Sequence, residues 1–188
     1  MRNIEMSYKE VRAVYGKDSI RVYQAYSKII ADEAILYGRF GSHFNLNRMT
    51  WIKPSFLWMM YRCGWAEKEG QEKVLAIDIK RTAFDYLVKN AVPSSYDESS
   101  EMTKEEWKDA IKNSDVRCQW DPERDINGNA LEYRSLQIGI RGKAIYDYVY
   151  DWILDMTDIT EFVHELNVMR KRGCDIQTYL PDEKKYEI

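Results

Sequence analysis

The fold is decided near the start of the chain, by the stretch EVRAVYGKDSIRVYQAYSKIIADEAILYG (residues 10–38). Apolar and polar residues alternate over residues 10–15 and again over residues 19–26, which predicts two β-strands. A Gly-Lys-Asp turn separates them, so we expect an antiparallel hairpin. A helix is then expected over residues 27–37, begun by a serine that can cap it and followed by a glycine that suits the left-handed position.

The rest of the chain interleaves helices and strands. Periodicity and turn residues predict helices over residues 54–63, 81–91, from Thr103, 143–155 and 159–170, and strands over residues 74–79, 116–120 and 133–140. Residues 39–50 have no clean period and are expected to form a long loop, and residues 121–129 a turn-rich loop. This order indicates an α+β fold with a central, mostly antiparallel sheet and flanking helices. The doubly wound parallel alternative lacks a glycine-rich turn between strand and helix.

Length and composition indicate one globular domain. The chain has 188 residues, of which 45% are hydrophobic and 31% charged, enough to build a core without a metal or a disulfide. The net charge of −3 excludes an overall field that would draw the protein onto nucleic acid or acidic lipid, although a local basic patch stays open. We expect a single domain over residues 1–188, with a polar tail from about residue 174.

Nothing in the sequence indicates export, a membrane or a metal. Residues 1–6 contain no apolar stretch that could serve as a signal peptide, and the most apolar run, residues 56–61, is far shorter than a membrane-spanning helix. The three cysteines are too widely spaced for a disulfide framework or a metal knuckle. The acidic residues 119–125 lack the spacing of a calcium site. We therefore expect a cytoplasmic protein with no bound metal and no membrane partner.

The strongest candidate for a binding site is the run RMTWIKPSFLW (residues 48–58). A helix is expected to start within it, and the N–H groups and dipole of a helix start favour an anion. An arginine and a lysine can close over that anion, and a tryptophan offers a flat face to a nucleobase or nicotinamide ring. We predict that a nucleotide is bound by Arg48, Thr50, Trp51, Lys53 and Ser55. The alternative is that the aromatic residues are core and the cations are solvated or paired with acids.

The strand expected over residues 19–26 carries further candidates. Gln24 falls on the same face as the apolar residues, so its amide would need partners if it is buried. Arg21 lies on the other face and Tyr26 at the strand's end. We include all three as candidates, the alternative being that Gln24 is a satisfied core amide.

The strand expected over residues 133–140 has a polar face of small residues that includes Gln137. Such a face suits a ligand cleft, with Arg134 nearby as a candidate for phosphate binding, unless it is the solvent-facing side of the sheet. Of the two histidines, His43 in the long loop is the better candidate for a general base. His164 lies within a predicted helix and has no second histidine at helical spacing.

Several segments resemble an uncharacterised family, the domain of unknown function 4291. The matching segments are residues 12–15, 22–26, 48–62, 64–65, 119–125 and 133–139. The resemblance covers roughly residues 10–170, and the long tryptophan-rich run makes it specific. The family name implies no activity.

A second resemblance is to ADP-ribosyltransferases. It rests on a short strand ending in Gln24-Ala25-Tyr26, a helix running into Gly38-Arg39-Phe40, and then an aromatic-rich helix and a strand. These enzymes bind NAD in the cleft of a split sheet and often close the site with a glutamate on a late strand. The resemblance therefore implies a split sheet, NAD as the cofactor, and Gln137 in the position of that glutamate. An amide cannot deprotonate a nucleophile as a carboxylate can.

Three functions follow as hypotheses. In an NAD-dependent transferase of the ADP-ribosyltransferase type, Arg21 or Arg48 would hold the pyrophosphate and Tyr26 and Trp51 would stack on the rings. The catalytic candidates are then Gln137, Tyr26 and His43. The second hypothesis is a module that binds or processes nucleic acid, and the third is a non-catalytic interaction protein. The transferase hypothesis predicts a small nucleotide ligand, an acceptor that is protein or nucleic acid, and one cleft shared by Gln24, Arg48, Lys53 and Gln137.

Overall fold

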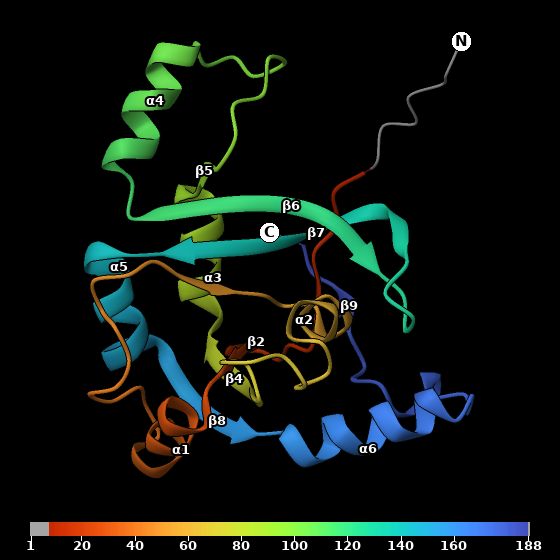
Figure 1. Cartoon of the computed structure of the whole chain (residues 1–188). Coiled ribbons are helices and arrows are strands. Elements are labelled where there is room, and N and C mark those ends of the chain that lie inside the picture. Colours follow the sequence, from red (N-terminus) through yellow and green to blue (C-terminus); the bar gives the residue numbers. More distant parts are fainter. Residues whose placement is uncertain (1–7, 188) are drawn as a thin grey trace, which may run out of the picture.

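Two sheets organise the protein in the computed structural model, which describes residues 8–187 (Figure 1). The three-stranded sheet has the order β2 (Ser19–Tyr26), β4 (Lys73–Lys80), β8 (Ile153–Asp158). The four-stranded sheet has the order β3 (Thr50–Ile52), β7 (Ala130–Ile140), β6 (Val116–Arg124), β5 (Val92–Pro93). Neighbouring strands are antiparallel in every pair except β5 and β6. The predicted α+β class and mostly antiparallel sheet are confirmed.

The two sheets meet along β2 and β3 at a single backbone bridge. The amide of Tyr23 donates to the carbonyl of Lys53 at 2.7 Å. Beyond this bridge the Gln24 side chain, rather than another backbone pair, crosses the gap to the carbonyl of Trp51. The central sheet is therefore split between β2 and β3.

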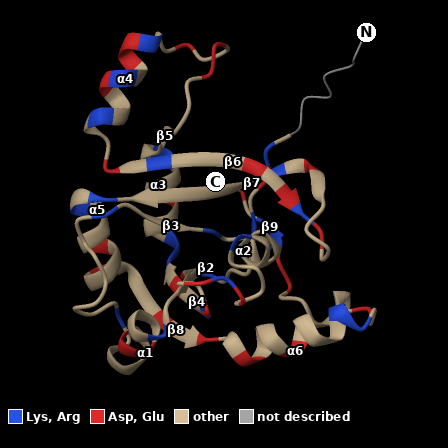
Figure 2. Ribbon diagram, in the orientation of Figure 1, with Lys and Arg blue, Asp and Glu red and all other residues tan. Residues whose placement is uncertain are grey.

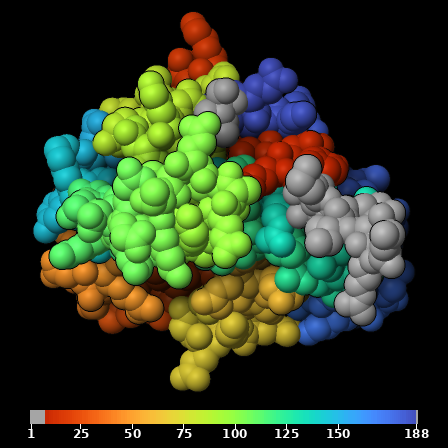
Figure 3. All heavy atoms as spheres, turned by 90° about the horizontal axis from the view of Figure 1, so that it is seen from above, coloured from red at the N-terminus to blue at the C-terminus, as the bar shows by residue number. Residues whose placement is uncertain are grey.

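Helices flank both sheets. Their bounds are α1 Lys28–Tyr37, α2 Phe56–Cys63, α3 Arg81–Asn90, α4 Lys104–Asn113, α5 Gly142–Asp147, the π-helix η1 Tyr148–Trp152, α6 Thr160–Lys171 and the 3-10 turn η2 Gln177–Tyr179. Helices α1 and α6 pack on the three-stranded sheet, and α2 and α3 each contact both sheets. Helix α4 has no buried residue and stands at the front of the face seen from above (Figure 3). The larger core lies between the sheets and their helices and includes Ile20, Ile77, Phe84 and Ile138.

Most helix ends agree with the sequence prediction, although Ser27, at the N-cap of α1, makes no capping hydrogen bond with its side chain. Gly38 and Gly64 follow α1 and α2 with φ of 65° and 60°, which is the left-handed conformation that favours glycine. Thr103 and Glu106 form the predicted capping box of α4. Local signals were sufficient at these positions because both partners of each contact are close in sequence.

Two predicted elements are wrong in part. The first strand, β1 (Arg12–Ala13), pairs with β9 (Lys184–Lys185) near the C-terminus, so only a Tyr15–Ile20 bridge remains of the expected hairpin. The polar tail therefore folds back onto the start of the chain, and Tyr186 is buried there. The helix expected over residues 143–155 ends as the π-helix η1, and residues 153–158 are the edge strand β8. Pairing with β4 overrides the helical period there.

Two other strands were not predicted at their full extent. Strand β3 lies at the end of the expected long loop, and β6 continues through residues 121–124 of the expected turn-rich loop. Strand β6 remains paired with β7 there despite Pro122, at which the register shifts.

The described residues show no segregation of charge (Figure 2), no membrane-spanning helix and no cluster of metal ligands. Lys and Arg are interspersed with Asp and Glu over the helices and strands (Figure 2). Within residues 8–187, no helix has the length and apolar character needed to cross a bilayer. Nor do any three His, Cys, Asp or Glu side chains in that range gather as metal ligands would. Residues 1–6, which were expected to lack a signal peptide, lie outside the described residues.

Candidate functional site

A cleft of about 380 Å³ opens where β2 and β3 separate, and we call it the split cleft. It is lined by the end of β2, the start of β3, residues 43–45 and 48–49, Lys53, and residues 69–71, with one side chain from α1 and two from α2. Seven of the predicted site residues line it as well: Gln24, Tyr26, His43, Arg48, Thr50, Trp51 and Lys53. The structure thus brings together residues from three separate parts of the sequence.

A hydrogen-bond network centred on Gln24 forms the inner wall of the split cleft. Gln24 is 2% exposed, and its Nε2 donates to Thr50 Oγ1 at 2.7 Å and to Tyr26 Oη at 2.9 Å. Its Oε1 accepts from Tyr148 Oη at 2.7 Å. The Tyr26 and Thr50 hydroxyls lie 2.6 Å apart. The predicted alternative of a satisfied core amide therefore describes Gln24, although its partners Tyr26 and Thr50 face the cleft.

Lys53 is a buried cation at the base of the split cleft. It is 5% exposed, and its Nζ lies 4.8 Å from the centre of the buried Trp58 ring. None of the ion pairs among residues 8–187 includes Lys53. Burial, and then the charge of Arg62, lowers the pKa of Lys53 to about 8. Asp121 and Cys63 favour the charged amine by smaller amounts, but no carboxylate among residues 8–187 forms an ion pair with it.

Two arginines and several rings complete the walls. Arg48 and Arg62 are exposed, line the split cleft and belong to no ion pair among residues 8–187. Trp51 lies against Gly139 of β7, where an added Cβ would come within 3.0 Å of the indole. Tyr26 packs edge-on against Phe44, with ring centres 5.8 Å apart. The cleft therefore combines positive charge with aromatic surface.

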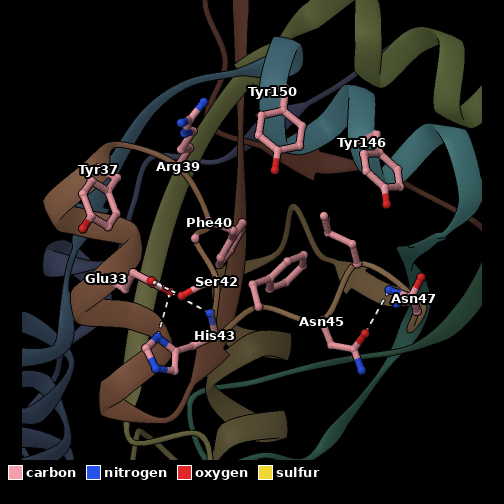
Figure 4. Close-up of a pocket in the computed structure, with 13 residues that line it drawn as sticks. Glu33, Tyr37, Arg39, Phe40, Ser42, His43, Asn45, Asn47, Tyr146 and Tyr150 are labelled. Atoms are coloured by element: carbon pink, nitrogen blue, oxygen red, sulfur yellow. Dashed lines mark hydrogen bonds and ion pairs between the residues drawn. The ribbon is translucent and has the colours of Figure 1, made fainter.

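His43 and Glu33 form an acid–base pair at the rim (Figure 4). Nδ1 of His43 lies 3.0 Å from Glu33 Oε2. The same carboxylate accepts from the backbone N–H of His43 and from the Ser42 hydroxyl, and these bonds lower the pKa of Glu33 to about 2. Gly41 allows this close approach, because an added Cβ would lie 2.7 Å from Glu33 Cγ. With Nδ1–H bonded to the carboxylate, Nε2 of a neutral His43 is an acceptor that can take a proton.

Four predicted site residues do not line the split cleft: Arg21, Ser55, Arg134 and Gln137. Arg21 makes a bidentate pair with Asp78 at 2.8 and 2.7 Å on the three-stranded sheet. Arg134 donates to the carbonyl of Trp120 at 2.8 Å. Neither residue lines the split cleft.

Gln137 also lies outside the lining of the split cleft. Its amide donates to Asp121 at 2.6 Å, on the neighbouring strand β6. It lies two residues along β7 from Gly139, the register partner of Trp51, and so faces the same side of the sheet as Trp51. The expected shared cleft therefore contains Gln24, Arg48 and Lys53 but not Gln137.

The start of α2, where the sequence predicts a bound anion, is occupied by side chains of the chain itself. Ser55 caps the helix by accepting from the N–H of Trp58 at 3.1 Å. The carboxyl group of Glu183 accepts from the N–H of Phe56 at 2.7 Å. Because Glu183 is 127 residues further along the chain, nothing local in the motif could have indicated it.

Sequence reasoning missed Glu33 and Tyr148, which hold the site in shape. Glu33 lies in α1 and is followed closely by Gly38 and Gly41. Two glycines so close together indicate that the chain turns back and packs against α1. Tyr148 carries no such signal, since it lies within a segment expected to be an ordinary helix.

Comparison with known proteins places the chain in a family but in no functional class. A search of curated proteins finds no match. The family model described as "Domain of unknown function (DUF4291)" matches residues 10–186, which include both sheets and all the residues of the split cleft. The chain therefore belongs to the DUF4291 family.

Proposed function

We propose that the split cleft binds a nucleotide, and that this nucleotide is NAD, used as the donor in a transferase reaction of the ADP-ribosyltransferase type. The observation that carries the proposal is the buried amine of Lys53, which opens on the cleft without a carboxylate partner among residues 8–187.

The ligand has to be an anion. Keeping Lys53 buried and protonated costs free energy, and the charge of Arg62 adds to that cost. A phosphate or pyrophosphate group would offset both the cost of burying the charged amine and its repulsion by Arg62. Arg48 and Arg62 would be additional donors to it. Structural lysines buried to this extent are normally paired, so an unpaired one that lines a cleft favours ligand binding.

The aromatic wall favours a nucleotide over inorganic phosphate. Trp51 and Tyr26 present ring surface next to the cationic group, and Thr50 adds a hydroxyl. Stacking on such rings and hydrogen bonds to hydroxyl groups are how proteins hold bases and riboses. The volume of the split cleft is within the range of small-molecule sites.

The transferase step rests on the resemblance to ADP-ribosyltransferases and is supported by the split of the sheet and by the His43–Glu33 pair. The bond between C1′ of the ribose and the nicotinamide nitrogen breaks, and its electron pair stays on nicotinamide. The acceptor's nucleophilic atom bonds to C1′, and its proton passes to Nε2 of His43. Glu33 stabilises the imidazolium that forms. In this scheme His43 is the general base, as the sequence predicted, and Gln137 takes no part.

Thermal shift with NAD tests the binding step. A ligand at about 100 times its dissociation constant stabilises by roughly 2.7 kcal/mol, which raises the melting temperature of a domain of this size by about 5–11 °C. Lys53→Met should abolish this shift without lowering the melting temperature of the free protein, since it removes a buried charge and keeps the volume. Lys89→Met, an exposed lysine on α3, is the matched control and should behave as the wild type.

Release of nicotinamide tests the chemical step. His43→Gln should retain the NAD-induced shift and lose nicotinamide release. An NAD shift that survives Lys53→Met would contradict the binding site, and a shift produced by an oligonucleotide but not by NAD would favour the nucleic-acid hypothesis. No shift with any nucleotide would favour the non-catalytic interaction protein.

A further inference from the structure

A second pocket, of about 750 Å³, lies beside the split cleft and shares residues 43–45 with it (Figure 4). We call it the tyrosine pocket, after Tyr37, Tyr146 and Tyr150 at its rim. The loop before β3 therefore forms a wall of both pockets. A group bound in one pocket would lie next to a ligand in the other.

Two stacked and exposed tyrosine rings form one side of the tyrosine pocket. The ring centres of Tyr146 and Tyr150 are 6.3 Å apart with 25° between their planes, and the residues are 48% and 58% exposed. Tyr148, between them, turns inward to bond Gln24, which anchors this part of η1. The two tyrosines thus keep about half of their surface exposed although they stack on each other. Such surface is what unpaired bases stack on.

Polar groups surround these rings. The guanidinium of Arg39 lies 5.3 Å from the centre of the Tyr150 ring, and Arg39 belongs to no ion pair among residues 8–187. Asn45 and Asn47 lie at the other end of the pocket, joined by a 2.9 Å bond from the Asn47 N–H to Asn45 Oδ1 (Figure 4). Carboxamides pair with base edges, and an arginine without a carboxylate partner can hold a phosphate or cover a base.

We propose that the tyrosine pocket binds an unpaired nucleobase of a single-stranded nucleic acid. The aromatic rings supply stacking, the asparagines read the edge of the base, and Arg39 complements the backbone charge. If the proposed function holds, the bound nucleotide is also the acceptor for ADP-ribose. The binding itself does not depend on the proposed function.

The charge distribution favours a single strand over a duplex. Duplex binding needs a broad cationic surface along the backbone, and the chain has a net charge of −3 with its charges interspersed (Figure 2). Binding to a splayed base needs only the local groups of the pocket. A protein segment is the other class of occupant, and the experiment includes it.

Fluorescence anisotropy with labelled single-stranded oligonucleotides of eight mixed-sequence nucleotides, DNA and RNA, tests the proposal on the full chain. The single strand should bind, and the same oligonucleotide annealed to its complement should bind at least about tenfold more weakly. Tyr146→Ala/Tyr150→Ala should weaken single-strand binding by about tenfold or more, as loss of base stacking does elsewhere. Tyr179→Ala, which removes a tyrosine of similar exposure outside the pocket, should leave binding unchanged.

Three outcomes would overturn the proposal: no binding of any single strand, equal binding by the double variant and the wild type, or displacement of the oligonucleotide by an acidic peptide that binds more tightly. Both substituted tyrosines are exposed, so circular dichroism should show an intact fold. Lys53→Met separates this test from that of the proposed function. It should abolish the NAD shift and leave oligonucleotide anisotropy as in the wild type, so either proposal can fail alone.

Discussion

Replacement of Gln24 by leucine tests whether the network at the split of the sheet holds the two sheets together. Leucine leaves the Tyr148 hydroxyl and the Trp51 carbonyl without their bonds to the amide, whereas Tyr26 and Thr50 can still bond each other. A buried polar group without a partner costs about 1–3 kcal/mol, so two of them should lower the free energy of unfolding by about 2–6 kcal/mol. For a chain of this length the melting temperature should fall by at least about 4 °C.

Urea denaturation of the single and double variants measures this effect. Gln24→Leu/Tyr148→Phe no longer buries an unpartnered hydroxyl and should be more stable than Gln24→Leu alone, by about 1–3 kcal/mol. The four corners of the cycle give the coupling between the two side chains. A loss of less than about 0.5 kcal/mol in Gln24→Leu would refute the reasoning, because an ordinary surface substitution has an effect of that size. Strictly additive effects in the cycle would refute it as well, because they would show no coupling between the two side chains.

Two further predictions concern the rim and the tail. In Gly41→Ala the added methyl group should displace the Glu33 carboxylate from residues 42–43. Nicotinamide release should fall while the protein stays folded. A variant as active as the wild type would show that the contact between Glu33 and His43 is unimportant. Burial raises the pKa of Glu183 to about 8, so the folded state holds a proton that the unfolded state has lost between pH 4.5 and 8. The free energy of unfolding should therefore fall as pH rises through this window. Urea denaturation at several pH values should show a weaker pH dependence of this free energy in Glu183→Gln. An unchanged pH dependence would mean that other groups cause it.

The local signals in the sequence identified most of the candidate site. Arg48, Thr50, Trp51 and Lys53 stand on one short motif, and alternation along the second strand placed Gln24 on the buried face. The structure places these residues at one cleft, and their positions could be inferred because each depends on neighbours within a few residues. Strand alternation and helix caps could be predicted for the same reason.

Contacts between distant parts of the chain account for what could not be predicted. The carboxyl group of Glu183, near the C-terminus, occupies the start of α2, and the same C-terminal segment pairs with β1 in place of the expected hairpin. Tyr148 reaches Gln24 across 124 residues from a π-helix in a segment whose period indicated a regular helix. Gln137 bonds Asp121 because β6 continues beyond the residues that a strand signal marked. Pairing partners of this kind are set by the tertiary fold and leave no mark in the local pattern.

The central claim is that a bound anion supplies the counter-charge of Lys53, and the pH dependence of NAD affinity tests it most directly. The groups around Lys53 are Arg62 and Cys63 of α2 and Asp121 of β6. Arginine and the pyrophosphate of NAD keep their charges between pH 7 and 9. Burial raises the pKa of the Cys63 thiol, so that group stays neutral over most of this range.

Isothermal titration calorimetry at pH 7 and pH 9 measures the affinity. With a pKa of about 8, Lys53 is mostly protonated at pH 7 and mostly neutral at pH 9, so NAD affinity should fall about tenfold between them. At pH 8, binding should take up about half a proton, seen as a dependence of the heat on the buffer's ionisation enthalpy. Lys53→Met should bind weakly and equally at both pH values. Wild-type affinity that is the same at pH 7 and pH 9, with no proton taken up, would contradict the account.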